Sequence, residues 1–269
     1  MERRTAAKVA VSTVVIVAVV AAAFAHPVSP SPAERGFFGV PNVSNVPDDA
    51  DGHRLTASIN SDTGNGLGIE GVVVKGGARY GVLTDDDQTT TAIYQPSPDG
   101  VVYERTVAGE DRAERRLENA REDNATELLW YENDTDGTTI VSVDSDEGDI
   151  AEEIEGSASM YINNLYVVEY DRTDRNGGEV YEPHGGWFEG FGTYHATDVS
   201  GEVRTTDGAV RHANVSWRSW RVENYAYYVL AKLFTDKPER TRTAIEFEAV
   251  EDGAETPDWV KRARDERSS

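Results

Sequence analysis

Residues 243–250 have the sequence Thr-Ala-Ile-Glu-Phe-Glu-Ala-Val, in which apolar and acidic side chains alternate. In an extended chain Ile245 and Phe247 fall on one face, and Glu246 and Glu248 fall on the other. A period of two residues is typical of a β-strand with one buried face and one solvated face. The segment therefore predicts a strand of an antiparallel sheet, the sheet type that commonly has one wet face.

Segments with β character recur upstream of this strand, mostly in pairs whose members are separated by a turn. The turns are rich in Gly, Pro, Asn and Asp, which suit tight reversals of the backbone. A single strand is expected over 53–59, and the predicted pairs are 68–75 with 79–84, 89–94 with 101–107, 127–131 with 138–143, and 199–204 with 209–217. The predicted fold class is mainly β with minor α, built on a curved antiparallel sheet.

Two segments predict short helices. The apolar residues of 109–123 are limited to a narrow stripe, so this segment is expected to be a solvated helix lying on the sheet, or no helix. Residues 149–160 are expected to form a second helix with Ile150, Ile154 and Met160 directed inward.

Residues 222–234 fit both a helical stripe and a strand. Their β-branched and aromatic content and the absence of a helix-capping residue favour a strand, which is expected to pair with 241–250.

The chain begins with a basic segment and an apolar run of 17 residues, 9–25. The run is either a signal peptide cleaved after Ala25 or an uncleaved signal anchor, an apolar transmembrane helix. The basic residues before it predict a cytoplasmic N-terminus and an extracellular domain, so the membrane is a predicted partner through 9–25. Residues 26–50 hold five of the ten prolines and predict an extended spacer. The β domain is expected over 51–260, followed by a charged tail, 261–269.

Acidic residues are in large excess throughout the chain, with 49 Asp and Glu against 26 Lys and Arg. This net charge of -23 repels nucleic acid phosphates and anionic lipid headgroups, so neither is an expected partner. A global excess of this kind favours adaptation to high salt, where charges are screened over short distances. The chain has no cysteine, and therefore no disulfide and no lipid-modifiable thiol.

One glycine-rich segment, 183–192, contains His184 and three aromatic residues, and His195 follows three residues after it. A metal or acid–base site formed by His184, Glu189 and His195 would make the protein a secreted hydrolase, the alternative function. A β-loop whose aromatic residues cap the core explains the same pattern more simply. No catalytic or nucleotide-binding motif is present, and no cofactor is predicted.

Residues 144–155 resemble a calcium loop because Asp144 opens the segment and Glu155 stands at its twelfth position. The sixth position holds Asp149, where a calcium loop needs Gly for its turn, and the fifth, Gly148, has no side-chain oxygen. No metal site is therefore predicted.

Four Asn-x-Ser/Thr sequons are candidate glycosylation sites in an exported protein: Asn42, Asn124, Asn133 and Asn214. Asn214 falls in a predicted strand, where modification is less favoured. Glycans on these residues would also suit a purely structural envelope protein, a further alternative.

Several short motifs within 194–263 carry a family resemblance: Asp-Val-Ser-Gly-Glu-Val at 198–203, Thr-Asp-Gly-Ala-Val-Arg at 206–211, and Glu-Thr-Pro-Asp-Trp-Val at 255–260. Val-Tyr-Glu-Arg at 102–105 resembles another strand of the same family. These segments resemble the haloarchaeal surface lipoproteins of uncharacterised function, whose domain is similar to the half-barrels of bacterial lipoprotein carriers (LolA-like). The resemblance covers about half the chain, and its motifs are structural. It carries over no catalytic residue.

The resemblance implies a half-barrel-like sheet curled around an apolar hollow that could hold an acyl chain. The chain departs from the family because no lipid-attached Cys follows the apolar run. The sequence thus predicts a non-catalytic extracytoplasmic module, membrane-anchored by 9–25, for a hydrophobic ligand or a surface partner. The aromatic and apolar residues expected to line the hollow are Trp130, Tyr166, Trp187, Phe191, Trp217, Tyr227 and Phe247.

Overall fold

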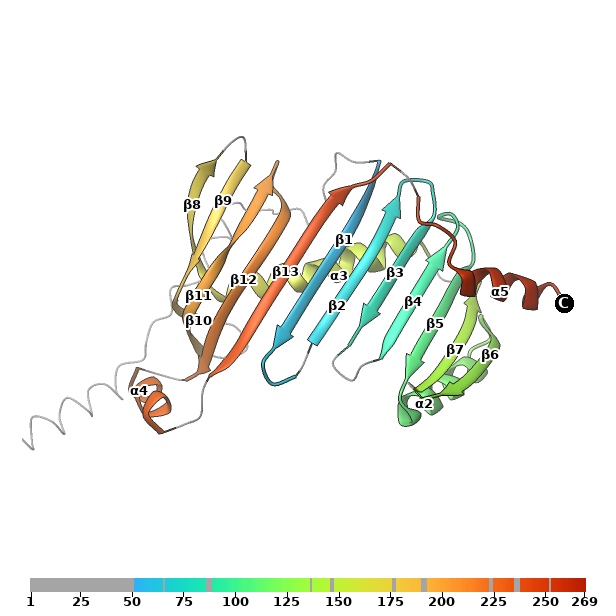
Figure 1. The fold of residues 1–269 in the computed structure, drawn as a ribbon, viewed down its shortest axis with the longest axis horizontal. Coiled ribbons are helices and arrows are strands. Elements are labelled where there is room, and N and C mark those ends of the chain that lie inside the picture. The colour runs from blue at the N-terminus through green and yellow to red at the C-terminus, as the bar shows by residue number, and fades with distance from the viewer. Residues whose placement is uncertain are drawn as a thin grey trace, which may run out of the picture.

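The computed structural model describes residues 51–64, 66–85, 89–135, 137–145, 148–175, 178–189, 193–222, 225–234, 238–251 and 253–269. All the strands of this part belong to one antiparallel sheet of 13 strands, shown in Figure 1. Their order is β6-β7-β5-β4-β3-β2-β1-β13-β12-β11-β9-β8, and β10 pairs with β11. Because β6 and β8 are the two ends of this order and do not pair with each other, the sheet stays open.

The first half of the domain forms one side of the sheet and contains these elements: β1 Gly52–Ser61, β2 Gly66–Val74, β3 Arg79–Thr84, β4 Thr90–Gln95, β5 Val102–Ala108, α2 Glu110–Glu122, β6 Thr126–Asp134 and β7 Gly137–Asp144. The second half begins with α3 Ile150–Asn164 and a short 3-10 helix, Leu165–Val167. It continues with β8 Glu169–Arg175, β9 Gly178–His184, β10 Gly186–Glu189, β11 Thr193–Thr206, β12 Ala209–Arg221, α4 Tyr225–Phe234, β13 Glu239–Ala249 and α5 Asp258–Arg267.

The two halves join in the middle of the sheet, where β13 pairs antiparallel with β1. Leu55 stands opposite Phe247 and Ala57 opposite Ile245, and all four side chains are buried. The alternation within 243–250 thus marks the central seam of the fold, and the predicted curved antiparallel sheet is confirmed. No helix in the described part is long and apolar enough to cross a bilayer, and the run 9–25 lies outside that part.

One face of the sheet, which we call the inner face, carries both α2 and α3. Helix α3 lies across β3, β2, β1 and β13, as Figure 1 shows. Gly71 and Gly81 stand opposite each other on β2 and β3, directly beneath Ile154. A methyl group added to Gly71 would lie 2.7 Å from Cγ2 of Ile154. The paired glycines therefore let the fully buried Ile154 approach the sheet backbone.

The N-terminus of α3 is fastened to the sheet by polar side chains. Asp149 caps the helix by accepting a hydrogen bond from the Ala151 N–H, and Arg79 donates two bonds of 2.6 and 2.9 Å to its carboxylate. Gln95, fully buried, accepts a bond from the Ile150 N–H and donates to three backbone carbonyls. These bonds satisfy groups that a buried helix end would otherwise leave unpaired.

Helix α5 packs on the opposite, outer face, in a region where the sequence predicts a charged tail over 261–269. Val260 and Ala263 are fully buried against an aromatic cluster that contains Tyr94 and Tyr103. The guanidinium of Arg264 lies 5.9 and 5.6 Å from the centroids of these two rings. Two small apolar residues and one arginine over aromatic rings hold this helix on the sheet. Because so few apolar residues are needed for this contact, the composition of the segment resembles that of a solvated tail.

Two details of the predicted elements are wrong. Residues 225–234 form helix α4, not a strand, because β13 already pairs with β1 on one side and β12 on the other. No sheet edge is left there for a further strand. Met160 of α3 is 46 % exposed and does not point inward, because the buried stripe of the helix follows Ile150, Ile154, Ala158 and Ile162.

Candidate ligand cavity

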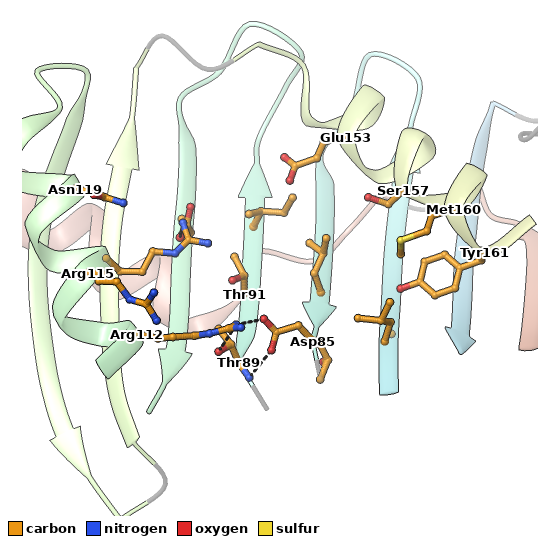
Figure 2. Close-up of a pocket in the computed structure, with 17 residues that line it drawn as sticks. Asp85, Thr89, Thr91, Arg112, Arg115, Asn119, Glu153, Ser157, Met160 and Tyr161 are labelled. Carbon is orange, nitrogen blue, oxygen red and sulfur yellow. Dashed lines mark hydrogen bonds and ion pairs between the residues drawn. The ribbon is translucent and has the colours of Figure 1, made fainter. Parts of the chain in front are cut away.

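A cavity of about 740 Å³ lies on the inner face between α2 and α3. Figure 2 shows it from the helix side, with α2 forming one wall, α3 the other and the strands below. It is lined by Leu67, Gly68, Leu83, Thr84, Asp85, Thr89, Thr91, Ile93, Glu104, Arg112, Arg115, Arg116, Asn119, Glu153, Ser157, Met160 and Tyr161. Ligand sites in proteins are concave and typically hold several hundred Å³.

The strand side of the cavity contains an apolar surface. Leu67, Leu83 and Ile93 come from β2, β3 and β4, and each packs into the main core. Met160 and Tyr161 extend this surface from α3, as Figure 2 shows. Burial raises the pKa of the Tyr161 hydroxyl to about 12, so this side chain stays neutral. The cavity therefore offers an uncharged surface to an apolar group.

The α2 wall of the cavity is polar. Arg112, Arg115, Arg116 and Asn119 follow the spacing that places side chains on one helical stripe. Ala113 is buried against the sheet and holds this helix in place. Because the apolar side of α2 packs on the sheet beside the cavity, the polar stripe of the helix faces the cavity.

The three arginines of this wall have different partners. Arg112 forms an ion pair with Asp85 and donates a 3.2 Å bond to Thr89. Nη1 of Arg116 lies 3.6 Å from Oε1 of Glu104. Arg115 donates from Nε to the Asp111 carbonyl and forms no ion pair in the described part of the chain. Its two terminal nitrogens are thus the best placed of the wall to meet an anionic group.

The carboxylates of the cavity are Asp85, Glu104 and Glu153, as many as its arginines. Burial is the main cause that raises the pKa of Glu153, and the negative charge of Glu104 raises it further. The positive charge of Arg116 offsets part of this increase. The whole chain carries nearly two acidic residues for each basic one. The cavity is therefore electrostatically unlike the rest of the molecule.

The residues that the sequence predicts to line a hollow lie elsewhere. Trp217 and Phe247 are buried in the core beneath and beside α3. Trp130 lies on the outer face, with the Arg262 guanidinium 4.4 Å from its ring. Aromatic content alone does not separate a packed core from a ligand wall.

The other predicted lining residues that the structure describes are also outside the cavity. Trp187 packs against His195 at 4.6 Å between ring centroids. Tyr166 and Tyr227 are exposed, and Phe191 lies outside the described residues. None of the six described residues of that prediction lines the cavity between α2 and α3.

The two histidines of the hydrolase hypothesis have separate surroundings. Nε2 of His184, a partly exposed side chain on β9, lies 3.8 Å from Oε2 of Glu169 and 3.9 Å from Oδ1 of Asp171 on β8. His195 is enclosed by Trp187 and Tyr228, and burial first, then the charge of Lys232, lower its pKa.

Among the described residues no hydrogen bond joins His184 to His195. The side chain of Glu189 is outside the described part. The described residues thus give this hypothesis no convergent acid–base pair.

The described acidic residues of the segment that resembles a calcium loop make other contacts. Asp149 caps α3, and Oε1 of Glu155, within that helix, lies 3.6 Å from Nε2 of His53. Asp146 and Glu147 are not described. Within the described ranges no group of three or more His, Asp or Glu side chains is placed to hold a metal ion.

The sequons lie in different settings. Asn124 and Asn133 are exposed; Asn124 lies two residues before β6, and Asn133 is the penultimate residue of that strand. Asn214 is half-buried within β12, where its Oδ1 accepts a bond from Arg242. Asn42 is outside the described residues.

No model of a known protein family and no curated protein sequence matches the chain. The resemblance to haloarchaeal surface lipoproteins therefore stays a prediction from the motifs quoted above.

Proposed function

We propose that the protein is an extracytoplasmic binding module, anchored by residues 9–25, that holds an amphiphile with an acyl chain in the cavity between α2 and α3. The observation that carries this proposal is the cavity itself, which has an apolar floor and an arginine wall in an otherwise acidic molecule. No observation favours the hydrolase as strongly, because that hypothesis has no convergent acid–base pair in the described part.

The apolar surface supports the proposal for the acyl end of the ligand. Methylene groups placed against Leu83, Ile93 and Met160 would leave water, at about 0.8 kcal/mol per buried CH₂. Met160 is especially suitable because its unbranched, flexible side chain adapts to ligands of different shape. Because Met160 is 46 % exposed, part of its side chain is open to contact with a ligand.

The arginine wall supports the proposal for the polar end. A carboxylate or phosphate can accept two parallel bonds from one guanidinium, and Arg115 has both terminal nitrogens available. Glu153 faces this region from the opposite wall. The neutral balance of the lining lets an anionic headgroup enter where the remaining surface repels it.

Photocrosslinking tests the proposal on the full-length protein in phosphatidylcholine vesicles. A fatty acid that carries a diazirine on its chain is added and irradiated, and the modified peptides are identified by mass spectrometry. We expect modification within α2 and α3, near Met160 and Tyr161. Modification confined to residues 9–25, which would show that the probe reached the bilayer, would overturn the proposal.

A pair of variants on α3 tests whether the cavity is the site. Ser157 lines the cavity, and Ser157→Phe would fill part of it. Gly156 is the matched control, since a Cβ at this exposed position meets nothing within 4 Å. We expect Ser157→Phe to reduce crosslinking of α2 and α3 at least tenfold and Gly156→Phe to leave it unchanged. Equal crosslinking of α2 and α3 in both variants would show that the ligand does not bind in this cavity.

A second pair of variants tests the polar end. Arg115→Gln removes the available guanidinium, and Arg121→Gln removes an exposed arginine of the same helix that does not line the cavity. We expect Arg115→Gln alone to weaken binding of the fatty acid about tenfold or more, because a charged hydrogen bond contributes about 1.5–3 kcal/mol. Binding of the corresponding fatty alcohol should change little.

A further inference from the structure

Exposed apolar side chains gather on helix α4. The large hydrophobic residues that are clearly exposed in the described part of the chain are Tyr131, Met160, Tyr166, Tyr227, Leu230, Leu233 and Phe234. The last four all belong to the ten residues of α4. Leu233 and Phe234 are 68 % and 80 % exposed, which is unusual for side chains of this size in a folded domain.

These four residues lie on one side of the helix. Successive residues of an α-helix are about 100° apart, so with Tyr228 set at zero, Leu233 falls at about 140°, Leu230 at about 200°, Phe234 at about 240° and Tyr227 at about 260°. The four directions span about 120° and are centred opposite Tyr228. Helix α4 therefore has one apolar outward face and one inward anchor.

The anchor fixes the orientation of the helix. Tyr228 is only 8 % exposed, and its ring lies 4.2 Å from His195, 6.0 Å from Trp187 and 6.1 Å from Trp220. Nζ of Lys232 lies 5.8 Å from the same ring. Since Tyr228 holds its side of α4 against this cluster, the face that carries Leu233 and Phe234 points away from the sheet.

The occupant best suited to this outward face is the bilayer that the chain itself is predicted to enter. The apolar run 9–25 is followed by a spacer, 26–50, whose 25 residues could extend to about 80–90 Å at most. Helix α4 can therefore reach the surface of the membrane that holds the run. Its sequence, Tyr-Ala-Tyr-Tyr-Val-Leu-Ala-Lys-Leu-Phe, has one lysine and no acidic residue, so the helix itself adds no charge repulsion toward lipid headgroups.

We infer that α4 is a membrane-contact helix, which lies in the bilayer interface with Leu230, Leu233 and Phe234 among the acyl chains. Tyr227 takes the headgroup level, where aromatic residues with a polar tip are favoured. This inference rests on the proposed anchoring by 9–25, but it is independent of the ligand cavity. A second contact with the bilayer orients the sheet relative to the membrane.

Site-directed spin labelling tests the inference on the full-length protein, because the chain has no cysteine of its own. Leu233→Cys and Phe234→Cys are labelled with a nitroxide in phosphatidylcholine vesicles, and their accessibility to oxygen and to a water-soluble nickel chelate is measured. Tyr131→Cys is the aqueous control, 50 % exposed on β6 at the other end of the sheet from α4 (Figure 1). Val17→Cys reports whether the run 9–25 is inserted.

We expect the labels at 233 and 234 to be accessible to oxygen and protected from the chelate, as the label at Val17 is, and the label at Tyr131 to show the reverse. Aqueous accessibility at 233 and 234 with an inserted Val17 would overturn the inference and leave the anchor intact. Low accessibility to both reagents would instead assign the face to a protein contact. Spin–spin broadening in that case would identify a second copy, and its absence another segment of this chain.

Discussion

Helices α3 and α4 are both amphipathic, but the sheet covers the apolar face of only one of them. In α3 the side chains of Ile150, Ile154, Ala158 and Ile162 are buried across the inner face. Among the described side chains of α4, those of 227–234, Tyr228 is the one that is buried, and the apolar face opposite is exposed. A periodic sequence pattern shows which residues share one face of a helix. It does not show which part of the molecule covers that face.

The difference originates in the strands beneath the helices. Under α3 the cross-strand pair Gly71 and Gly81 gives Ile154 room to approach the backbone. In the part of α4 whose side chains are described, 227–234, it is Tyr228 that meets an aromatic cluster. Substitutions in the two helices should therefore have very different effects on the free energy of unfolding.

Ile154→Ala has the largest expected effect. The side chain is fully buried, and its removal leaves a cavity over the glycine pair, so we expect a loss of about 2–5 kcal/mol. Urea unfolding followed by tryptophan fluorescence measures this loss. A loss below about 1 kcal/mol would mean that α3 is not firmly docked on the sheet.

A second variant tests the same contact from the sheet. Gly71→Ala alone should cost about 1–3 kcal/mol, because its methyl group would lie 2.7 Å from Cγ2 of Ile154. In the Ile154→Ala background Cγ2 is absent, so the same change should cost much less. Strictly additive losses in the double variant would contradict the packing described for this helix.

Gln95→Leu is expected to have the next largest effect. It leaves the Ile150 N–H and three backbone carbonyls without their partner in a fully buried position, at a cost of about 1–3 kcal/mol. Asn163→Leu, at an exposed amide of α3, is the control and should change stability by less than about 0.5 kcal/mol. Similar losses in the two variants would show that the buried amide does not fasten the helix.

The sequence predicts the central sheet well because its alternation reports burial directly. It misses β8, whose residues Glu169–Arg175 are mostly polar, because an edge strand is defined by backbone pairing and has little apolar pattern. It misplaces α4 because the aromatic residues of 225–234 suit either state, and only the pairing of β13 on both sides excludes a strand. Such pairing is a property of the whole sheet.

The sequence indicates less of the candidate cavity than of the fold. The spacing of Arg112, Arg115, Arg116 and Asn119 is visible in the sequence and marks a polar helical stripe. What this stripe faces depends on where α2 and α3 dock, and the residues that form the cavity come from six separate elements and the connection between β3 and β4. Most of the aromatic residues predicted to line a ligand site instead pack against other side chains of the protein. Packing and ligand binding favour the same aromatic residue types, so the sequence does not distinguish the two.

Lowered pH should weaken both helix contacts, because each contains a histidine whose pKa burial lowers: His53 beneath α3 and His195 beside α4. A buried histidine with a lowered pKa binds fewer protons in the folded state than in the unfolded state, whose pKa is about 6.5. The stability that depends on the neutral form is therefore present above about pH 6.5 and is lost as the pH falls below it.

His53→Phe tests the α3 side of this comparison. We expect it to reduce the loss of stability between about pH 7.5 and 5.5, measured by urea unfolding at each pH. Glu155, 3.6 Å from His53, opposes the effect in part because its charge favours the protonated ring. Because His195 is less deeply buried and also lies near Lys232, His195→Phe provides the matched measurement on the α4 side. An unchanged pH profile in both variants would show that neither ring controls the acid sensitivity.

The smallest expected effect is that of substitutions on the exposed face of α4. Leu233→Gln and Phe234→Gln remove side chains that are 68 % and 80 % exposed, so in the absence of lipid each should change the free energy of unfolding by less than about 0.5 kcal/mol. Glutamine is chosen because it is a good helix former, which keeps the helix itself unperturbed. A loss above about 2 kcal/mol without lipid would mean that protein covers this face. In that case α3 and α4 would differ only in which part of the chain buries them, and the contact of α4 with the membrane would have to be abandoned.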